Sequence, residues 1–291
     1  MDWMQIAFDL EADACLRLEA VLERLGASAI TYLDPGDEPV LEPGVEKTPL
    51  WPRVRMVILL EDQTAVGRIR EQVCAHLGRE PAGWSVQAVQ DQAWERVWLD
   101  QCVPLRFGER LWVIPADLKA PVPDAVNVRL DPGMAFGSGT HPSTALCLEW
   151  LDGFQLHDRS IVDYGCGSGI LAVAALCLGA RIAYGVDIDI QALRASRENA
   201  KRNGVSEQLR LFAAAGSLPP AADVVVANIL ARILCSLAST LTRITCPGGA
   251  LVLSGILQDQ MDAVVQAFTK NFSFEPPRFR DDWVCLIGRR K

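Results

Sequence analysis

Short apolar segments alternate with helical segments along the second half of the chain. Strands are predicted at residues 160–164, 182–187, 209–212, 223–228 and 250–254, with helices starting at 170 and spanning 191–203, 229–242 and 258–271. This alternation is typical of the α/β class, in which a doubly wound, Rossmann-like sheet carries helices on both faces. Two more strand candidates between residues 272 and 289 have no helix between them, which predicts a C-terminal antiparallel hairpin at the end of the sheet.

A smaller unit is predicted N-terminal to this sheet in the sequence. Strands at residues 3–10, 28–33, 54–60 and 84–89 and helices at 11–26 and 64–77 follow in the order strand, helix, strand, strand, helix, strand. That order is typical of a small α+β ferredoxin-like domain. We therefore predict that residues 1–91 form this domain and that residues 108–291 form the doubly wound one.

Residues 92–107 connect the two predicted domains. Trp94, Val97 and Trp98 share one face of a helix predicted over residues 92–102, and Pro104 ends that helix. The favoured interpretation is a linker helix packed between the domains. An aromatic wall beside a ligand is the alternative.

The charge balance and the cysteine pattern argue against several classes of function. The 28 basic and 36 acidic residues give a net charge of −8, which argues against direct nucleic-acid binding. The nine cysteines lack metal-type spacing and do not cluster with the three histidines, so no metal is expected. The longest uncharged apolar-rich run, residues 164–180, is shorter than the ~20 residues of a membrane helix. The acidic N-terminus has no secretion signal, so we expect a cytoplasmic protein with reduced thiols and no membrane contact. We also expect a monomer.

A glycine-rich turn follows the first strand of the predicted sheet. Gly165, Gly167 and Gly169 occupy alternate positions after Asp163. Glycine allows positive φ and close approach of a ligand, and the next helix offers free N–H groups to an anion. A dinucleotide motif would need another glycine where this chain has Ile170. The spacing therefore favours a cofactor other than a dinucleotide. Asp163, Gly165 and Gly167 are the candidate binding residues. A purely structural turn is the alternative.

Two further polar residues end later strands. Asp187 ends the second strand of the sheet, where its carboxylate can accept hydrogen bonds from both hydroxyls of a ribose. Asp189 better suits capping of the next helix. Asn228 ends a buried strand at the carboxyl edge, where open α/β sheets bind ligands, although it could also cap the following helix. The three signals together are stronger than any one of them.

The segment 130–144 has the composition of a lid. It contains three glycines and two prolines and leads into a helix that begins near His141. Thr144 lies in the predicted first turn, where its hydroxyl can reach a bound group. His141 is interpreted as a capping or packing residue, with a general base as the less favoured alternative.

These motifs resemble those of the PrmA family, bacterial enzymes that methylate large-subunit ribosomal protein eleven. The resemblance is carried by residues 131–144, 163–171, 187–189, 199–204 and 228–230, and it covers the whole chain. It implies a class I methyltransferase sheet with S-adenosyl-L-methionine as methyl donor. It also implies lysine and N-terminal amines of the ribosomal protein as acceptors, and an N-terminal domain that recognises this substrate. The family's cofactor residues fall at Thr144, Gly165, Asp187 and Asn228.

The acceptor amine sets the chemical difficulty of such a reaction. A lysine amine has a pKa of about 10.4, so about one in 2,500 is neutral at pH 7. An apolar pocket lowers that pKa by desolvation, and alignment for attack supplies further acceleration. Since no Asp–His pair stands out, no catalytic base is assigned, and we expect Asn228 and nearby backbone carbonyls to hold the amine.

Three alternatives remain open at this point. A nicotinamide-dependent dehydrogenase shares the sheet and the role of Asp187, but Ile170 and the Asn228 motif count against it. A methyltransferase acting on a small molecule or RNA shares the cofactor site, and the acidic charge disfavours RNA. A non-catalytic binding module could use the same fold.

Overall fold

The computed structural model describes residues 3–36, 50–61, 65–89, 103–130 and 139–291. The chain divides into two compact units, residues 1–97 and 98–291. Both the linker helix predicted over residues 92–102 and the larger part of the predicted lid, residues 131–138, lie outside the described residues.

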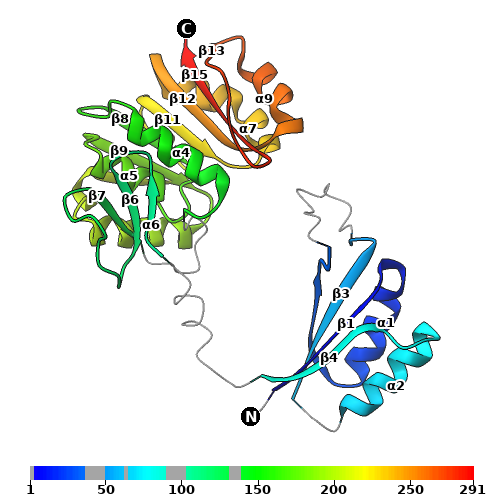
Figure 1. Cartoon of the computed structure of the whole chain (residues 1–291). Helices are drawn as coiled ribbons and strands as arrows, with labels where there is room; N and C mark the ends of the chain where they lie inside the picture. The colour runs from blue at the N-terminus through cyan, green and yellow to red at the C-terminus, as the bar shows by residue number, and fades with distance from the viewer. Residues whose placement is uncertain (1–2, 37–49, 62–64, 90–102, 131–138) are drawn as a thin grey trace. The chain divides into compact units, whose positions relative to one another are not determined.

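The N-terminal unit is a four-stranded antiparallel sheet with two helices on one face (Figure 1). Its elements are β1 (Trp3–Glu11), α1 (Ala12–Arg24), β2 (Ala27–Leu33), β3 (Arg53–Leu60), α2 (Ala65–Leu77) and β4 (Ala82–Val89). The strands lie in the order β2-β3-β1-β4. Because strand side chains point alternately to opposite faces, Phe8 of β1 and Met56 of β3 are buried with Leu18 of α1 and Ile69 of α2. The intervening residues of β1 and β3 face away from the helices.

An eight-stranded mixed sheet forms the centre of the second unit. Five parallel strands are β8 (Ser160–Tyr164), β9 (Ile182–Asp187), β10 (Leu209–Ala213), β11 (Ala222–Asn228) and β12 (Thr245–Leu257). The last three are β13 (Phe272–Phe274), β14 (Arg278–Arg280) and β15 (Trp283–Arg290). The order is β10-β9-β8-β11-β12-β15-β13, with β14 also paired to β15. β15 runs antiparallel to β12, β13 and β14. The C-terminal strands are therefore antiparallel as predicted, but three strands form where two were predicted.

Helices cover both faces of this sheet (Figure 1). One face packs against α4 (Pro142–Gly153), α5 (Ile170–Cys177) and α6 (Ile190–Arg202), and the other against α7 (Ala231–Ser236), α8 (Ala238–Ile244) and α9 (Met261–Phe268). The prediction of a single helix at residues 229–242 is wrong. The segment forms two helices, α7 and α8, which meet at Leu237. The N–H of Leu237 is shared between the carbonyl oxygens of Ile233 and Leu234. Such sharing tightens the last turn of a helix and ends it.

A small three-stranded sheet precedes α4 and was not predicted. It consists of β5 (Leu105–Phe107), β6 (Leu111–Pro115) and β7 (Val126–Leu130). Residues 105–107, at the end of the predicted linker, form β5 and pair with β6. No helix in the part of the chain that the structure describes is long and apolar enough to cross a membrane.

Candidate functional site

The carboxyl ends of three neighbouring strands bring the predicted site residues to one edge of the sheet. β8 lies between β9 and β11, and the three strands run parallel. Asp163 is the second-last residue of β8, Asp187 ends β9 and Asn228 ends β11. Thr144, in the first turn of α4, joins this group through a hydrogen bond to Asn228.

The predicted glycine turn connects β8 to α5. Gly165, Gly167 and Gly169 have φ angles of 79°, 54° and 77°, a region that residues with a side chain rarely adopt. A Cβ atom added at Gly165 would lie 2.4 Å from Cγ2 of Ile229. The N–H of Gly165 also donates to the carbonyl oxygen of Val186 at 2.7 Å, which holds the turn against β9. Both backbone conformation and lack of space therefore require glycine here.

The carboxylate of Asp187 links the glycine turn to the end of β9. Its Oδ2 accepts from the N–H of Gly167 at 2.9 Å, and its Oδ1 accepts from the N–H of Asp189 at 2.9 Å. A carboxylate oxygen can accept a second hydrogen bond, so Asp187 can brace the turn and still receive two donors from a ligand. Asp189 caps α6 by accepting from the N–H of Gln191 at 2.8 Å, which confirms the structural interpretation of that residue.

Two buried polar residues of α6 hold the carbonyl groups of the same turn. Ser196 Oγ donates to the carbonyl oxygen of Gly167 at 2.9 Å, and Asn199 Nδ2 donates to that of Ser168 at 2.9 Å. Both side chains are buried. Ser196 was missed by sequence reasoning. Its spacing of three residues from Asn199, on the same helical face as the buried Ala192, is the signal that could have identified it.

A hydrogen bond between Asn228 and Thr144 joins two segments that are distant in sequence. Asn228 Nδ2 donates to Thr144 Oγ1 at 3.0 Å, and Thr144 is buried. This contact orients the amide so that Oδ1 of Asn228 is left to accept from another group. Ser254, at the same edge of the sheet, donates through Oγ to the carbonyl oxygen of Ser143 at 3.1 Å and fixes the start of α4.

Asp163 is an acid buried beside the glycine turn, with only 1% of its surface exposed. Its Oδ2 accepts from the N–H of Ala172 at 3.0 Å, while Oδ1 has no hydrogen-bond partner among the described residues. Burial raises the pKa of this carboxyl to about 7, the hydrogen bond from Ala172 opposes the shift, and the negative charge of Asp187 adds to it. Asp163 therefore combines an unsatisfied oxygen with a proton that is held near neutral pH.

The raised pKa of Asp163 predicts a pH dependence of stability. The unfolded chain releases this proton near its ordinary pKa of 3.8, whereas the folded protein holds it until about 7. Unfolding between these values releases a proton, so this group makes the free energy of unfolding fall as pH rises, by at most about 1.4 kcal/mol per pH unit. Urea denaturation at about pH 5 and about pH 8 should show that Asp163→Asn removes this slope. An equal slope in the variant would assign the pH dependence to other groups.

His141 caps α4, as its favoured interpretation predicted. Its Nδ1 accepts from the N–H of Ser143 at 3.3 Å, and its ring packs edge-on against Trp283 with 4.5 Å between ring centroids. Burial lowers the pKa of the imidazole. Within the described ranges, no group of three or more His, Cys, Asp or Glu side chains is arranged to hold a metal ion.

Comparisons with known proteins agree with one another. The family model described as ribosomal protein L11 methyltransferase (PrmA) matches residues 2–291. Proteins named ribosomal protein L11 methyltransferase from Pseudomonas putida (strain W619) and Alkalilimnicola ehrlichii are 48% identical over 296 residues and 49% identical over 294 residues, with 100% of each chain covered. A crystal structure of a ribosomal protein L11 methylase from Lactobacillus delbrueckii subsp. bulgaricus is similar with a TM-score of 0.60 and 31% identity, over 65% of this chain and 100% of that chain. The sequence matches extend over both units.

Proposed function

Since the chain belongs to the PrmA family of ribosomal protein L11 methyltransferases, we propose that it transfers methyl groups from S-adenosyl-L-methionine to lysine side-chain and N-terminal amines of that ribosomal protein. The observation that carries this proposal is the family match over residues 2–291. The meeting of the glycine turn, Asp187 and Asn228 at one sheet edge supports it.

The residues at this edge fit the methyl donor. When bound, S-adenosyl-L-methionine supplies a methyl group on a positively charged sulfur. Gly165 and Gly167 let the ligand approach the backbone, and Asp187 has lone pairs for two ribose hydroxyls. The unpartnered Oδ1 of Asp163 can accept from a cationic group, which would lower the pKa of that carboxyl. Thr144 accepts from the amide of Asn228, and its hydroxyl hydrogen is left to donate to the bound methyl donor.

Asp187→Ala is expected to weaken donor binding. The variant removes the acceptors for the ribose and also the bond from the N–H of Gly167, and losing hydrogen bonds to a charged group costs about 1.5–3 kcal/mol. Titration calorimetry should therefore show a dissociation constant raised by about tenfold to a hundredfold. Asp189→Ala is the matched control: it removes the cap of α6 and lowers stability by about 1 kcal/mol, but leaves donor affinity unchanged. Equal donor affinities of Asp187→Ala and the wild type would contradict the ribose role.

The acceptor amine is held at Asn228. Thr144 fixes the amide through the 3.0 Å hydrogen bond, which leaves Oδ1 of Asn228 to accept from an N–H of the amine. This hydrogen bond aims the lone pair of the amine nitrogen at the methyl group. Only the neutral amine is nucleophilic, and desolvation on entering the site lowers its pKa. Positioning by Asn228 then supplies the remaining acceleration without a dedicated base.

The remaining features of the proposal concern the whole chain. The strand order β2-β3-β1-β4 of the N-terminal unit suits a ferredoxin-like domain, to which we assign recognition of the ribosomal protein. The proposed division is residues 1–91 for recognition, residues 92–107 as the linker and residues 108–291 for catalysis; β5, at the end of that linker, pairs with β6 of the catalytic unit. The enzyme acts in the cytoplasm as a monomer and binds its protein substrate without contacting nucleic acid.

Labelled S-adenosyl-L-methionine tests the proposal directly. The enzyme is incubated with the purified ribosomal protein and, in parallel, with a cell extract. Label should appear on that protein, and mass spectrometry of its peptides should place methyl groups on lysine and N-terminal amines. Label confined to RNA or to small molecules would contradict the proposal.

A further inference from the structure

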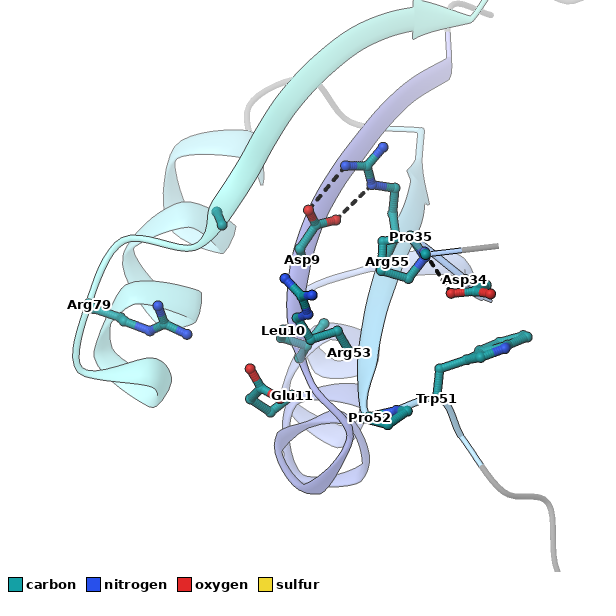
Figure 2. A pocket seen from close by; sticks show the side chains of 12 residues that line it. Asp9, Leu10, Glu11, Asp34, Pro35, Trp51, Pro52, Arg53, Arg55 and Arg79 are labelled. Carbon is teal, nitrogen blue, oxygen red and sulfur yellow. Dashed lines mark hydrogen bonds and ion pairs between the residues drawn. The ribbon is translucent and has the colours of Figure 1, made fainter. Parts of the chain in front are cut away.

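A cavity of about 440 Å³ opens in the N-terminal unit beside β1 and β3 (Figure 2). Asp9 and Glu11 of β1 lie directly opposite Arg55 and Arg53 of β3 in the antiparallel pair. These four residues alternate with the buried residues of both strands, so their side chains lie on the face away from α1 and α2. The cavity is therefore lined by charged groups on the open face of the sheet.

Asp9 and Arg55 of this cavity form an ion pair. Arg55 Nε and Nη2 donate to the two carboxylate oxygens of Asp9 at 2.7 and 3.1 Å. Gly83 of β4, with φ of +63°, makes room for this pair, since a Cβ atom added there would lie 2.8 Å from Asp9 Oδ2. The charges of Asp9 and Arg55 therefore neutralise each other on one side of the cavity (Figure 2).

Two further arginines line the cavity. Arg53 reaches in from β3, and Arg79 extends toward the strands from the segment between α2 and β4 (Figure 2). Both are exposed, and within the described residues neither is in a hydrogen bond or an ion pair. Trp51 and Pro52 also line the cavity and add apolar surface to it. Two unpaired guanidinium groups beside apolar surface are suited to a carboxylate with an aliphatic stem.

The acidic residues at the same cavity distinguish between classes of anion. Glu11 and Asp34 line it together with the arginines. A nucleic-acid backbone would bring successive phosphates against these acids and be repelled. A protein surface that carries a carboxylate close to a basic side chain would instead match both signs of charge.

We propose that this cavity is where the N-terminal unit captures the protein substrate, with Arg53 and Arg79 binding an exposed Asp or Glu side chain of the ribosomal protein. This inference rests on the proposed function and gives its recognition step a location and a chemistry. We expect contacts to the arginines to act on substrate binding and not on the chemical step, because the described residues that line the cavity belong to the N-terminal unit and the donor motifs belong to the second unit.

The test compares two double variants of the full-length enzyme. Arg53→Ala with Arg79→Ala empties the cavity of its unpaired cations. Arg17→Ala with Arg68→Ala is the matched control, since it removes two exposed arginines from α1 and α2. Steady-state methylation of the purified ribosomal protein is measured together with donor affinity. The cavity variant should raise KM for the ribosomal protein by about tenfold or more, with kcat and donor affinity within about twofold of wild type. The control should leave all three within about twofold.

Substrate variants identify the partner of the arginines. Exposed Asp and Glu residues of the ribosomal protein are replaced one at a time by Asn or Gln. One replacement should reproduce the rise in KM with the wild-type enzyme and add little to that of the cavity variant, as expected for two ends of one contact.

The outcomes separate this inference from the proposed function. Equal KM values for the two double variants would overturn the inference alone. So would a cavity variant that loses affinity for a ribosomal RNA fragment while methylating the free protein normally, because the occupant would then be a phosphate backbone. If the wild-type enzyme transferred no methyl group to the ribosomal protein, the proposed function and the inference would both fail.

Discussion

Gly167→Val is expected to abolish measurable binding of S-adenosyl-L-methionine, with a dissociation constant raised by at least about a hundredfold. Gly167 has a φ of 54°, where a β-branched residue is strongly disfavoured. The strain would displace the N–H that donates to Asp187 and the carbonyl that accepts from Ser196. The added side-chain atoms would also occupy the ligand's path along the turn.

Titration calorimetry with a matched glycine variant makes this result specific. Gly248→Val carries the same type of backbone strain, since Gly248 has a φ of 73° and nothing lies within 4 Å of an added Cβ. It lies near the start of β12, at the opposite edge of the sheet from the glycine turn. We expect Gly248→Val to lose stability but keep donor affinity. Donor affinity of the wild-type strength in Gly167→Val would mean that the turn is not the cofactor site.

Deleting residues 1–90 is expected to remove methylation of the ribosomal protein while leaving donor affinity within about a few-fold of wild type. Residues 98–291 form a compact unit with their own buried core, so the fragment should fold without the N-terminal unit. The loss of all recognition contacts should lower kcat/KM for the ribosomal protein by at least about a hundredfold. Donor binding by calorimetry and methyl transfer are to be measured on the same soluble fragment.

The alternative role of the N-terminal unit is to shield an apolar surface. In that case the fragment would aggregate, which size-exclusion chromatography reports. A soluble fragment that methylates the intact ribosomal protein at nearly the full rate would contradict the recognition role. The Arg53 and Arg79 variants probe the same role within the intact chain.

Much of the sheet of the second unit could be predicted because most of its strands are followed by helices along the chain. The alternation at 160–271, the glycine turn and the acid that ends β9 are all local patterns. The small sheet β5–β7 was missed because its three short strands follow one another with no helix between them, so they do not take part in the alternation of strands and helices. The break at Leu237 was missed because the apolar pattern continues across it.

The arrangement of the candidate site depends on contacts between distant segments. Local pattern placed Asn228 at a strand end, but its bond to Thr144 spans 84 residues, and Ser196 reaches the glycine turn from 29 residues away. The pKa of Asp163 is raised by burial under packed elements, a property that its neighbours in sequence do not carry. The residue types and their order in the chain were therefore enough to identify the family and the motifs. The partners, burial and proton affinity of the site residues come from packing, because these are properties of space around an atom and not of position along the chain.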